Sequence, residues 1–567
     1  MLQWVCVNRL RPYLPILTWL PAYRRAWLRD DALAAVSVWA LLIPQALAYA
    51  AIAGVPVQYG LYTAFAALIA YAIFGTSRQV VQGPSATVAA VSAAVITPII
   101  GAGALNTDEA AKWAAALALV SAVAYLGLGL LRMGWVSNFL SKAVLGGFIL
   151  GFAIGIAIDQ APKLLGVTAG DGSYAEDFVE LIRTIPDTSL STLLVGASAL
   201  AVLLALRYTR PKWPRALVVV VLTTVASVAF DLSQHGVAVT GDVPTGLFDV
   251  GLPGVGFGEL GTLVVGSLSI IFVGYSESLA AGRNVARAHD YDLDPDQELI
   301  AQGAACGAAG LVGGFVSDGS LSKTSVADAA GQRTQLASLL NAVLVLLTLL
   351  LLAGLFEELP AAALGAVVID AMIGLITFVE VRRYYRVNLG DWLAFVASMI
   401  GILTFGIIAG IVAGVVFSLL LLIARASNPR IRELGRAPDS EAYLDEKHHD
   451  DLVHTPGVLV VRIDGPLFFA DANRFLDHVH QLMRRSRAPI EAVVIDCEAI
   501  VQTDTDGADI VIELVKELQR DGRRLALARL QHSVREMWDR AGLIDLIGPE
   551  MLFVTVREAV DGVRKPT

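Results

Sequence analysis

Residues 313–331, GGFVSDGSLSKTSVADAAG, place a lysine, two aspartates and a run of hydroxyl side chains inside a long apolar region. Ionisable residues within membrane sequence are costly, and they mark functional sites by default. A helix that begins inside a membrane exposes unpaired backbone N–H groups and a partial positive charge at its N-terminus, and both attract anions. The stretch therefore indicates such a helix start, with Lys323 adding a full positive charge to an anion pocket.

A matching pattern occurs in the first half of the chain. There IPQALAYA is followed by GPSAT, as GYSESLAA is followed by GSLSKT in the second half. Gly83 lies 38 positions after Gln45, and Gly319 lies 42 positions after Glu277. Short, Gly- or Pro-interrupted segments in corresponding positions of two halves indicate the central site of a transporter. The hydroxyl groups that can add donors to the two helix starts are those of Ser85, Thr87, Ser320 and Ser322.

These polar residues also have structural interpretations. Lys323 could pair with Asp318 or Asp328, or extend its ammonium group to a membrane surface. Serines in membrane helices usually bond their own backbone or a neighbouring helix. Glu277 lies within an apolar run and predicts a coupling-ion or proton site, and the alternative is a buried structural hydrogen bond.

Other polar residues are less specific. Gln45 and Tyr49 are four positions apart and share one helix face, a pattern that by itself indicates packing more often than a ligand. Asp370, in VVIDAMIGL, is an open candidate. The histidines expected to be solvated are His289, His448 and His449.

Composition places the chain in a membrane. Its 567 residues are 56% hydrophobic and 17% charged, with a mean hydropathy of +0.64, which excludes an ordinary soluble protein. The net charge of −10 gives no support for a nucleic-acid partner. Cys6, Cys306 and Cys497 are far apart, so neither a disulfide framework nor a zinc site is expected. No nucleophile–base constellation is visible, so we expect no enzyme, and no cofactor beyond a coupling H+ or Na+.

The apolar runs define the domain organisation. We expect a cytosolic N-terminal segment at 1–31, a membrane domain at 32–424, a linker at 425–455 and a soluble domain at 456–567. The Arg-rich first segment precedes the first full apolar run, so no cleavable signal peptide is expected. A cell inner membrane is the expected location.

Hydropathy predicts ten to fourteen membrane spans, because a spanning helix needs about 20 apolar residues and fewer when it is broken or tilted. The positive-inside rule favours fourteen, with both termini in the cytoplasm. Lys and Arg follow the even-numbered segments, whereas residues 231–260 contain neither. Two repeats of seven spans must then be inverted relative to each other. The predicted segments are 32–53, 58–74, 85–101, 113–131, 143–158, 190–206, 216–231, 261–281, 298–314, 320–334, 336–355, 361–378, 391–406 and 408–424.

The C-terminal region alternates strand and helix patterns, which indicates a small α/β domain. The predicted strands are 457–465, 492–497 and 524–530, and the predicted helices are 470–486, 506–520 and 531–541.

Several motifs resemble those of the SulP anion transporters, the sulfate permease group, in content and order over nearly the whole chain. They are IPQALAYA, VQYGLYTA, YAIFGTSR, GPSAT, YDLDPDQELIAQG and GSLSKT. The resemblance implies a seven-plus-seven inverted repeat with core and gate domains, elevator-like alternating access and a homodimer. It also implies that the anion contacts and the acidic coupling position fall on particular residues. The implied anion contacts are Gln45, Tyr49, Ser85, Ala86, Thr87, Leu321, Ser322 and Lys323, and the coupling position is Glu277.

Two residues depart from the family pattern. Lys323 stands where the family often has arginine, so the site has a point charge without the bidentate fork. Ser85 stands where the family often has an apolar or aromatic residue. A smaller, more polar pocket favours a hydrated oxyanion or bicarbonate over a bare halide.

The C-terminal domain resembles the STAS domain, which follows the membrane part in this family. Related bacterial antagonists are phosphorylated on serine in a short turn that here reads DTDG, residues 504–507. Asp506 occupies the acceptor position, so the serine switch is absent, and Thr505 is a weak alternative acceptor. The domain is expected to be a packing and regulatory module that can bind a regulatory protein.

The sequence is compatible with three classes of function to different degrees. The leading one is secondary active transport of a small anion, sulfate first and bicarbonate or a dicarboxylate next, driven by H+ or Na+ through Glu277. The second is an uncoupled anion channel, exchanger or voltage-responsive motor, which would gain little from a buried carboxylate. The third is a signalling scaffold, which would not need hydroxyls converging on a half-helix start.

Overall fold

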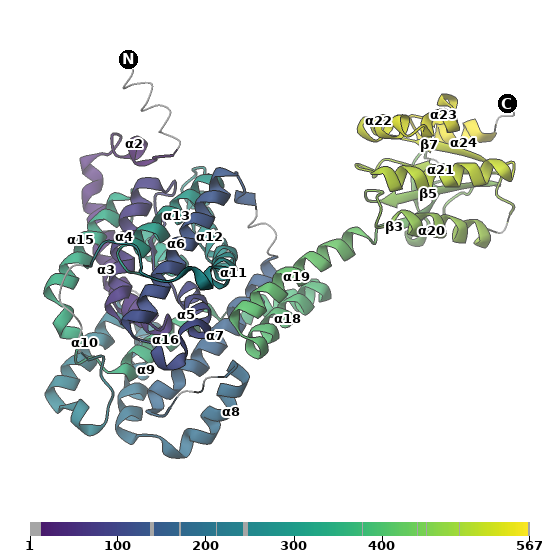
Figure 1. The fold of residues 1–567 in the computed structure, drawn as a ribbon. Coiled ribbons are helices and arrows are strands. Elements are labelled where there is room, and N and C mark those ends of the chain that lie inside the picture. The colour runs from purple at the N-terminus through teal and green to yellow at the C-terminus, as the bar shows by residue number, and fades with distance from the viewer. Residues whose placement is uncertain are drawn as a thin grey trace. The chain divides into compact units, whose positions relative to one another are not determined.

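The computed structural model describes residues 13–135, 141–168, 170, 172–210, 213–241, 248–376, 378–438, 440–449, 451–486 and 488–564. The chain divides into two compact units, Met1–Ser418 and Leu419–Thr567 (Figure 1). The boundary lies within one apolar helix, α19 (Ile407–Ala426). The first unit is almost entirely helical, whereas the second is built on a sheet.

Each apolar segment predicted from hydropathy coincides with a helix or an interrupted helix. By length and composition, five of the helices in the described residues can cross a membrane, and several shorter apolar helices accompany them. The number of crossings, fourteen, stays a prediction. Besides α19, the helices on the predicted segments are α3 (Leu28–Ile52), α4 (Gln58–Phe74), α5 (Ala86–Ile100), α6 (Asp108–Leu130), α7 (Lys142–Leu165), α9 (Leu190–Thr209), α10 (Arg215–Phe230), α11 (Leu260–Ile270) with the π-helical η7 (Ile271–Tyr275) and α12 (Ser276–Ala288), α13 (Pro295–Leu311), α14 (Leu321–Ala329), α15 (Leu336–Leu351), α16 (Ala361–Leu375) and α18 (Leu389–Phe405).

Two further helices, α8 (Tyr174–Thr184) and α17 (Phe378–Val387), were not among the predicted segments. Their sequences, YAEDFVELIRT and FVEVRRYYRV, carry charges too often for an apolar run. Hydropathy therefore missed them because they are amphipathic or polar connections rather than spans.

Polar residues at the helix starts explain where several helices begin. Thr107 accepts a hydrogen bond from a first-turn N–H of α6, and Ser141 and Ser189 do the same for α7 and α9. Asp294 caps α13, whose first residue is Pro295.

Glycines allow close contact between the helices. A Cβ atom on Gly60 of α4 would lie 2.0 Å from the carbonyl oxygen of Ala46 on α3. A Cβ atom on Gly147 of α7 would lie 2.0 Å from the carbonyl oxygen of Phe395 on α18. Small residues at such crossings let membrane helices pack without a large apolar side chain between them.

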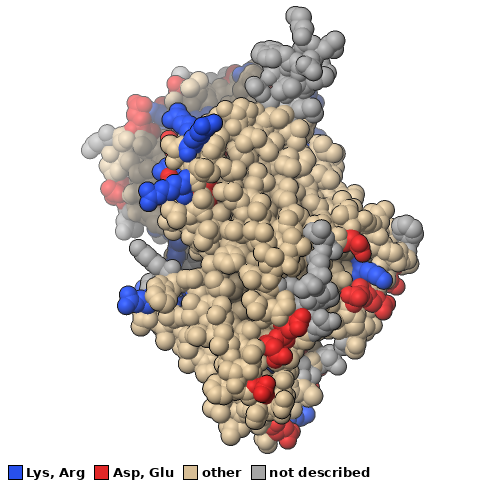
Figure 2. Space-filling view, turned by 90° about the vertical axis from the view of Figure 1, so that its left-hand side faces the viewer, with Lys and Arg blue, Asp and Glu red and all other residues tan. Residues whose placement is uncertain are grey.

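Apolar side chains cover the outer surface of the helical unit. Helices α10 and α15 lie on the side that faces the viewer in Figure 2, which shows a broad area with few charged side chains. Val225 and Val228 on α10, and Leu347 and Leu351 on α15, are exposed there. An exposed apolar surface of this extent, on helices that satisfy their own backbone hydrogen bonds, suits a lipid environment.

The helices of the first unit pack as two bundles. The core bundle contains α3 to α6 and α11 to α15, and the gate bundle contains α7, α9, α10, α16 and α18. Helix α3 also contacts α10 and α16, so it lies where the bundles meet. A cavity of about 430 Å³ lies between them, with Gln58 and Asn106 on the core side and Lys163 and Leu364 on the gate side.

Packing within the bundles follows the predicted repeat. When the predicted segments are numbered one to fourteen, the contact of four with eight (α6 with α11) has its counterpart in eleven with one (α15 with α3). Three more contacts have counterparts of the same kind. The contact α4–α15 corresponds to α13–α6, α7–α18 corresponds to α16–α9, and α5–α11 corresponds to α14–α3. Each contact recurs seven segments later, which is the pattern that two inverted repeats produce.

Two short strands join the repeats at their centre. Strand β1 (Gln82–Gly83) pairs antiparallel with β2 (Asp318–Gly319), and Gly83 lies opposite Asp318. Helix α5 begins three positions after β1, and α14 begins two positions after β2. The pairing therefore brings together the two interrupted segments that the sequence matched.

The second unit contains a six-stranded sheet in the order β4-β3-β5-β6-β7-β8. Strands β5 to β8 are parallel, and β3 and β4 are antiparallel to their neighbours. Phe475, Leu514 and Trp538 are buried in the larger of its two cores, and Val560 and Val563 of α24 in the smaller one. The elements are β3 (Arg430–Arg436), β4 (Tyr443–Asp445), β5 (Val458–Asp464), α20 (Ala472–Arg485), β6 (Ala492–Asp496), α21 (Thr505–Arg520), β7 (Arg524–Ala528), α22 (His532–Arg540), α23 (Leu543–Ile547), β8 (Leu552–Phe553) and α24 (Val556–Arg564).

The three predicted strands and three predicted helices of this domain are confirmed, but the predicted linker at 425–455 is wrong in its middle. Strand β3 forms part of the sheet beside β5, and β4 forms its edge. Sequence patterns missed β3 because it reads RIRELGR, with charges on most positions. Such a strand gives no apolar run, although its pairing with β5 makes it part of the domain.

Candidate anion site

The β1–β2 pair sets two helix starts side by side. Ser85 precedes α5 and Ser320 precedes α14, both with extended backbone, and neither side chain caps its own helix. The Ser320 hydroxyl lies 3.1 Å from that of Ser322 instead. The first-turn N–H groups of both helices are therefore left without side-chain caps, which leaves them available to an anion.

Lys323 lies between the two helix starts. Its side chain is fully buried, and its ammonium group donates a hydrogen bond to the carbonyl oxygen of Pro84 at 2.5 Å. A Cβ atom on Gly83 would lie 3.6 Å from the same nitrogen, so the glycine leaves room for the lysine. The cation of the second repeat is thus held at the start of the first repeat's helix, rather than extended to a membrane surface.

Several buried polar atoms near these helix starts have no hydrogen-bond partner in the described structure. They are the two carboxylate oxygens of Asp318, the hydroxyl of Ser85 and the amide oxygen of Gln45. Asp318 interacts electrostatically with Lys323 and with the nearby Ser85 hydroxyl, so its charge is offset within the site. Buried unpaired polar groups are rare in proteins, and a cluster of them indicates a site completed by a ligand, an ion or water.

Glu277 connects the site to span eight. It lies in the first turn of α12, directly after the π-helical segment η7, and accepts a hydrogen bond from the hydroxyl of Thr87 at 3.2 Å. It also interacts electrostatically with Lys323. π-Helical insertions occur frequently at functional sites, because they rotate the following side chains relative to a regular helix.

Gln45 and Tyr49 approach from α3, just beyond Pro44 in the middle of that helix. Both side chains are buried, and Tyr49 interacts electrostatically with Glu277 and Asp318. Helix α3 packs against both α5 and α14. The sequence-predicted residues of spans one, three, eight and ten therefore come from elements that meet.

The remaining predicted contacts differ in accessibility. Ala86 and Thr87 are buried in the first turn of α5. Leu321 is 41% exposed, and Ser322 is also exposed. The structure thus places Leu321 and Ser322 on an accessible face of α14, with the Lys323 side chain buried behind them.

The alternatives for the charged residues are partly resolved. Asp328 hydrogen-bonds His289 at 2.5 Å rather than Lys323. Asp370 accepts from Arg207 at 3.2 Å and from Arg215 at 2.7 Å, which joins α16 to α9 and α10. Asp370 therefore has a structural role at the described contacts. His289 is exposed, as predicted, and its hydrogen bond to Asp328 is an additional contact that the sequence did not predict. His448 is likewise bonded, to Asp445 at 2.9 Å.

The sequence did not single out Glu298, a buried carboxylate that fixes the geometry around the site. It accepts hydrogen bonds from the Tyr71 hydroxyl at 2.8 Å and from the backbone and hydroxyl of Thr76 at 2.8 and 2.6 Å. These contacts join the end of α4 to the start of α13. The only sequence signal was that Tyr71 and Thr76 lie in YAIFGTSR and Glu298 in YDLDPDQELIAQG.

A pair of glutamines supports the strands themselves. The side-chain amide of Gln82 donates to the amide oxygen of Gln302 at 2.9 Å, and Gln302 donates to the carbonyl oxygen of Ser317 at 2.8 Å. Asp31 similarly accepts two backbone N–H groups and one hydroxyl at Arg333 and Thr334, near the start of α15. These hydrogen bonds hold the strands and α15 in place, although the amide oxygen of Gln82 has no partner in the described structure.

Comparisons with known proteins agree with this architecture. A profile of the Sulfate permease family matches residues 28–398, and one of the STAS domain matches residues 451–559. The chain is 33% identical over 543 residues to a probable sulfate transporter of Mycobacterium tuberculosis strain H37Rv, covering 96% of each chain. It is 31% identical to low affinity sulfate transporter 3 of Stylosanthes hamata, covering 98% of this chain and 90% of that one.

Solved structures show the same fold. Murine solute carrier 26 family member A9, an anion transporter in the inward-facing state, superposes with a TM-score of 0.90 at 24% identity over 97% of this chain and 94% of that one. The transmembrane domain of a cyanobacterial bicarbonate transporter superposes with a TM-score of 0.62 at 22% identity over 69% of this chain and 98% of that one. This chain is a multi-pass membrane protein of the sulfate permease family, with a STAS domain after its membrane part.

Proposed function

We propose that the chain is a secondary active transporter of a small oxyanion, with sulfate as the first candidate. The carrying observation is the convergence of two uncapped helix starts, one from each repeat, on the buried ammonium group of Lys323. Helix N-termini and a desolvated cation both stabilise negative charge. The names of the relatives, which are sulfate transporters, support sulfate as the substrate.

The groups at the site suit an oxyanion. An oxyanion accepts hydrogen bonds in several directions, and the site offers backbone N–H groups together with the hydroxyls of Ser85 and Ser322. The Ser85 hydroxyl lies near the Asp318 carboxylate but makes no well-formed hydrogen bond in the described structure, so it is available to a bound anion. Bicarbonate and a dicarboxylate offer the same acceptor chemistry and are the alternative substrates.

Movement of the core bundle relative to the gate bundle would give alternating access. The site residues belong to α3, α5, α12 and α14, all in the core bundle, and the cavity of about 430 Å³ separates parts of the two bundles. A site carried entirely by one bundle can be exposed on either side of a membrane when that bundle moves as a unit. This arrangement supports an elevator-like mechanism.

Glu277 would couple transport to H+ or Na+. Its carboxylate lies beside the anion site and repels an anion unless a cation or proton neutralises it. Binding of the anion and of the cation would then favour each other by the same coupling free energy. Thr87 holds the carboxylate through the 3.2 Å hydrogen bond.

The test uses purified protein in proteoliposomes with imposed gradients. Radiolabelled sulfate uptake should exceed equilibrium under an inward H+ or Na+ gradient, and bicarbonate or dicarboxylates should compete according to their affinity. Uptake that only equalises sulfate on both sides, whichever cation gradient is imposed, would contradict coupled transport and favour an uncoupled exchanger or channel. A homodimer and a cytoplasmic location of both termini form part of the proposal, and cross-linking and cysteine accessibility test them.

A further inference from the structure

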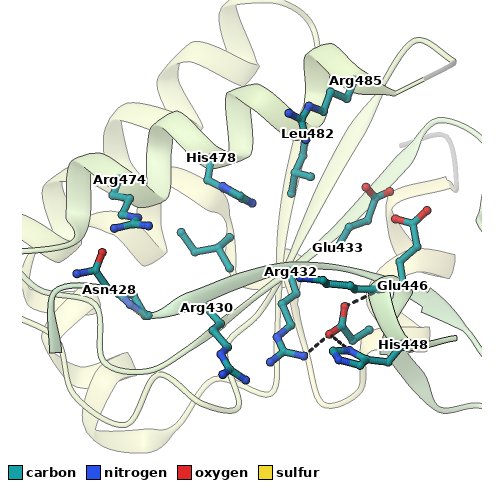
Figure 3. A pocket seen from close by; sticks show the side chains of 14 residues that line it. Asn428, Arg430, Arg432, Glu433, Glu446, His448, Arg474, His478, Leu482 and Arg485 are labelled. Atoms are coloured by element: carbon teal, nitrogen blue, oxygen red, sulfur yellow. Dashed lines mark hydrogen bonds and ion pairs between the residues drawn. The ribbon is translucent and has the colours of Figure 1, made fainter. Parts of the chain in front are cut away.

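A groove in the second unit gathers basic side chains from three elements (Figure 3). Its volume is about 660 Å³, and it extends from the start of β3 to the face of α20 and to the turn η9 (Glu446–His448) that follows β4. The basic residues that line it are Arg430, Arg432, Lys447, His448, Arg474, His478 and Arg485.

One face of α20 forms a wall of the groove. Arg474, His478, Leu482 and Arg485 follow one another at intervals of four, four and three positions, so they share a helix face. Figure 3 shows Arg474 and His478 extending from α20 towards β3. The spacing of these residues along α20 therefore places their basic side chains on the face that lines the groove.

Three of the arginines have no ionic partner among the described residues. Arg432 pairs with Asp445 and Asp464, whereas Arg430, Arg474 and Arg485 form no salt bridge with any described carboxylate. The groove's two glutamates, Glu433 and Glu446, have His454 as their ionic neighbour at 3.8 Å. The groove therefore contains more basic than acidic side chains, and like charges gathered in this way repel one another unless a counter-ion binds.

The pKa of His478 reflects both its burial and its basic neighbours. Burial, followed by the charges of Arg474 and Arg485, lowers the pKa of His478 below its usual value of 6.5. The groups that face the groove around it are Arg430, Arg432 and Glu433 on β3, and Asp445, Glu446, Lys447 and His448 beyond β3. A negative ligand would oppose this lowering, so its binding would favour uptake of a proton by His478.

We propose that this groove binds a phosphate group, carried by an acidic phospholipid or by a soluble phosphate ester. Arginine guanidinium groups match phosphate oxygens through paired N–H donors, and three of them here form no ion pair among the described residues. The edge of β3 adds main-chain groups, because β4 pairs only with Leu434–Arg436 and leaves the edge before Leu434 without a strand beside it in the described residues.

The position along the chain favours the phospholipid. Helix α19 is apolar up to Ile423 and ends at Ala426, and Arg430 lies four residues beyond it. Four residues span at most about 14 Å, so Arg430 lies within that distance of the helix end. Basic residues directly after a membrane helix bind acidic lipid head groups at the cytoplasmic surface.

The experiment compares neighbouring arginines in the full-length protein in detergent. Arg485→Glu and Arg474→Glu change the groove, and Arg484→Glu is the matched control, since Arg484 lies beside Arg485 on α20 but does not line the groove. Phosphatidylglycerol is titrated in, with phosphatidylcholine as the neutral lipid, and bound lipids are counted by native mass spectrometry. In a second arm, inorganic phosphate and glycerol 3-phosphate are titrated without lipid by calorimetry.

We expect the two groove variants to lose affinity for one phosphatidylglycerol by about tenfold, the scale expected for reversing one basic charge near a lipid head group, while Arg484→Glu matches the wild type. A loss confined to the soluble phosphates would keep the phosphate site and assign it to a soluble ester. Equal binding by all four proteins in both arms would overturn the proposal.

Discussion

The two repeats of the membrane unit share one geometry but differ in charge. Each supplies a span-one-type helix, a short strand and a helix that starts beside the strand of the other repeat. The first repeat contributes neutral groups to the site, those of Gln45, Tyr49, Ser85 and Thr87. All the charged side chains at the site come from the second repeat, namely Glu277, Asp318 and Lys323.

This difference separates two tasks. The inverted repeat provides two helix N-termini, so attraction of an anion is a property of both halves. Charge, and with it the capacity to couple a cation, comes from one half only. The halves are also interlocked, because Lys323 donates to Pro84 of the first repeat and Thr87 of the first repeat donates to Glu277.

Removal of the cation should produce the largest effect. Lys323→Ala leaves Asp318 buried without a counter-charge, and its oxygens have no hydrogen bond in the described structure. Breaking such a buried pair costs about 3–5 kcal/mol of stability. We expect a marked loss of thermal stability in detergent and loss of sulfate binding, whereas Lys323→Arg should retain part of the affinity.

A double variant separates stability from binding. Lys323→Ala combined with Asp318→Asn removes both charges, so stability should recover much of what the single variant loses. Sulfate binding should stay lost, because the cation that faces the anion is still absent. Recovery of sulfate affinity along with stability would mean that Lys323 acts only as the partner of Asp318.

Removal of the carboxylate should affect coupling more than binding. Glu277→Gln keeps the shape and the contact with Thr87 while eliminating the negative charge. We expect sulfate counterflow to persist and uphill uptake under an H+ or Na+ gradient to disappear. Counterflow in the same vesicles shows that the variant is folded. Uphill uptake at the wild-type level would show that Glu277 is not the coupling residue.

The sequence predicted the elements of this comparison better than their contacts. Apolar runs located the helices because a membrane helix must be predominantly apolar. The matched breaks at Gly83 and Gly319 predicted that two helix starts would meet, and the β1–β2 pairing bears this out. The pairing of Lys323 with Pro84 was not predictable, since the two residues are 239 positions apart and many polar partners were available.

Local patterns failed where tertiary packing decides the outcome. Strand β3 carries charges on most of its positions, yet it pairs with β5 along Arg430 to Glu433. Glu298, the first residue of the predicted segment 298–314, was not singled out from the sequence, but packing of α13 against α4 buries it beside Tyr71. In both cases a single stretch of sequence does not contain the partner that determines its environment.

A smaller effect is expected from the contact between the repeats. Thr87→Val preserves the shape of the side chain and removes the donor to Glu277, a change of about 1 kcal/mol. In the otherwise wild-type protein, Thr87→Val should make sulfate uptake severalfold less dependent on the driving cation. In a Glu277→Gln background the same substitution should add nothing to the loss of uphill uptake, because the two residues act through one contact. Additive effects would show that Thr87 contributes to the site independently.

The smallest effect is expected at a single neutral hydroxyl of the first repeat. The hydroxyls of Ser85 and Ser92 are both buried and unpartnered in the described structure, but only Ser85 stands at the start of α5. If Ser85 donates to the anion, Ser85→Ala should weaken sulfate binding about fivefold, the value of one hydrogen bond near 1 kcal/mol. Ser92→Ala, two turns further along the helix, should leave sulfate affinity unchanged. Ser92→Ala should leave thermal stability unchanged, because that hydroxyl has no partner in the described structure, whereas Ser85→Ala also removes a neighbour of the Asp318 carboxylate. Equal sulfate affinities for the two variants would show that the first repeat binds the anion through its helix start alone, and that its neutral side chains serve packing.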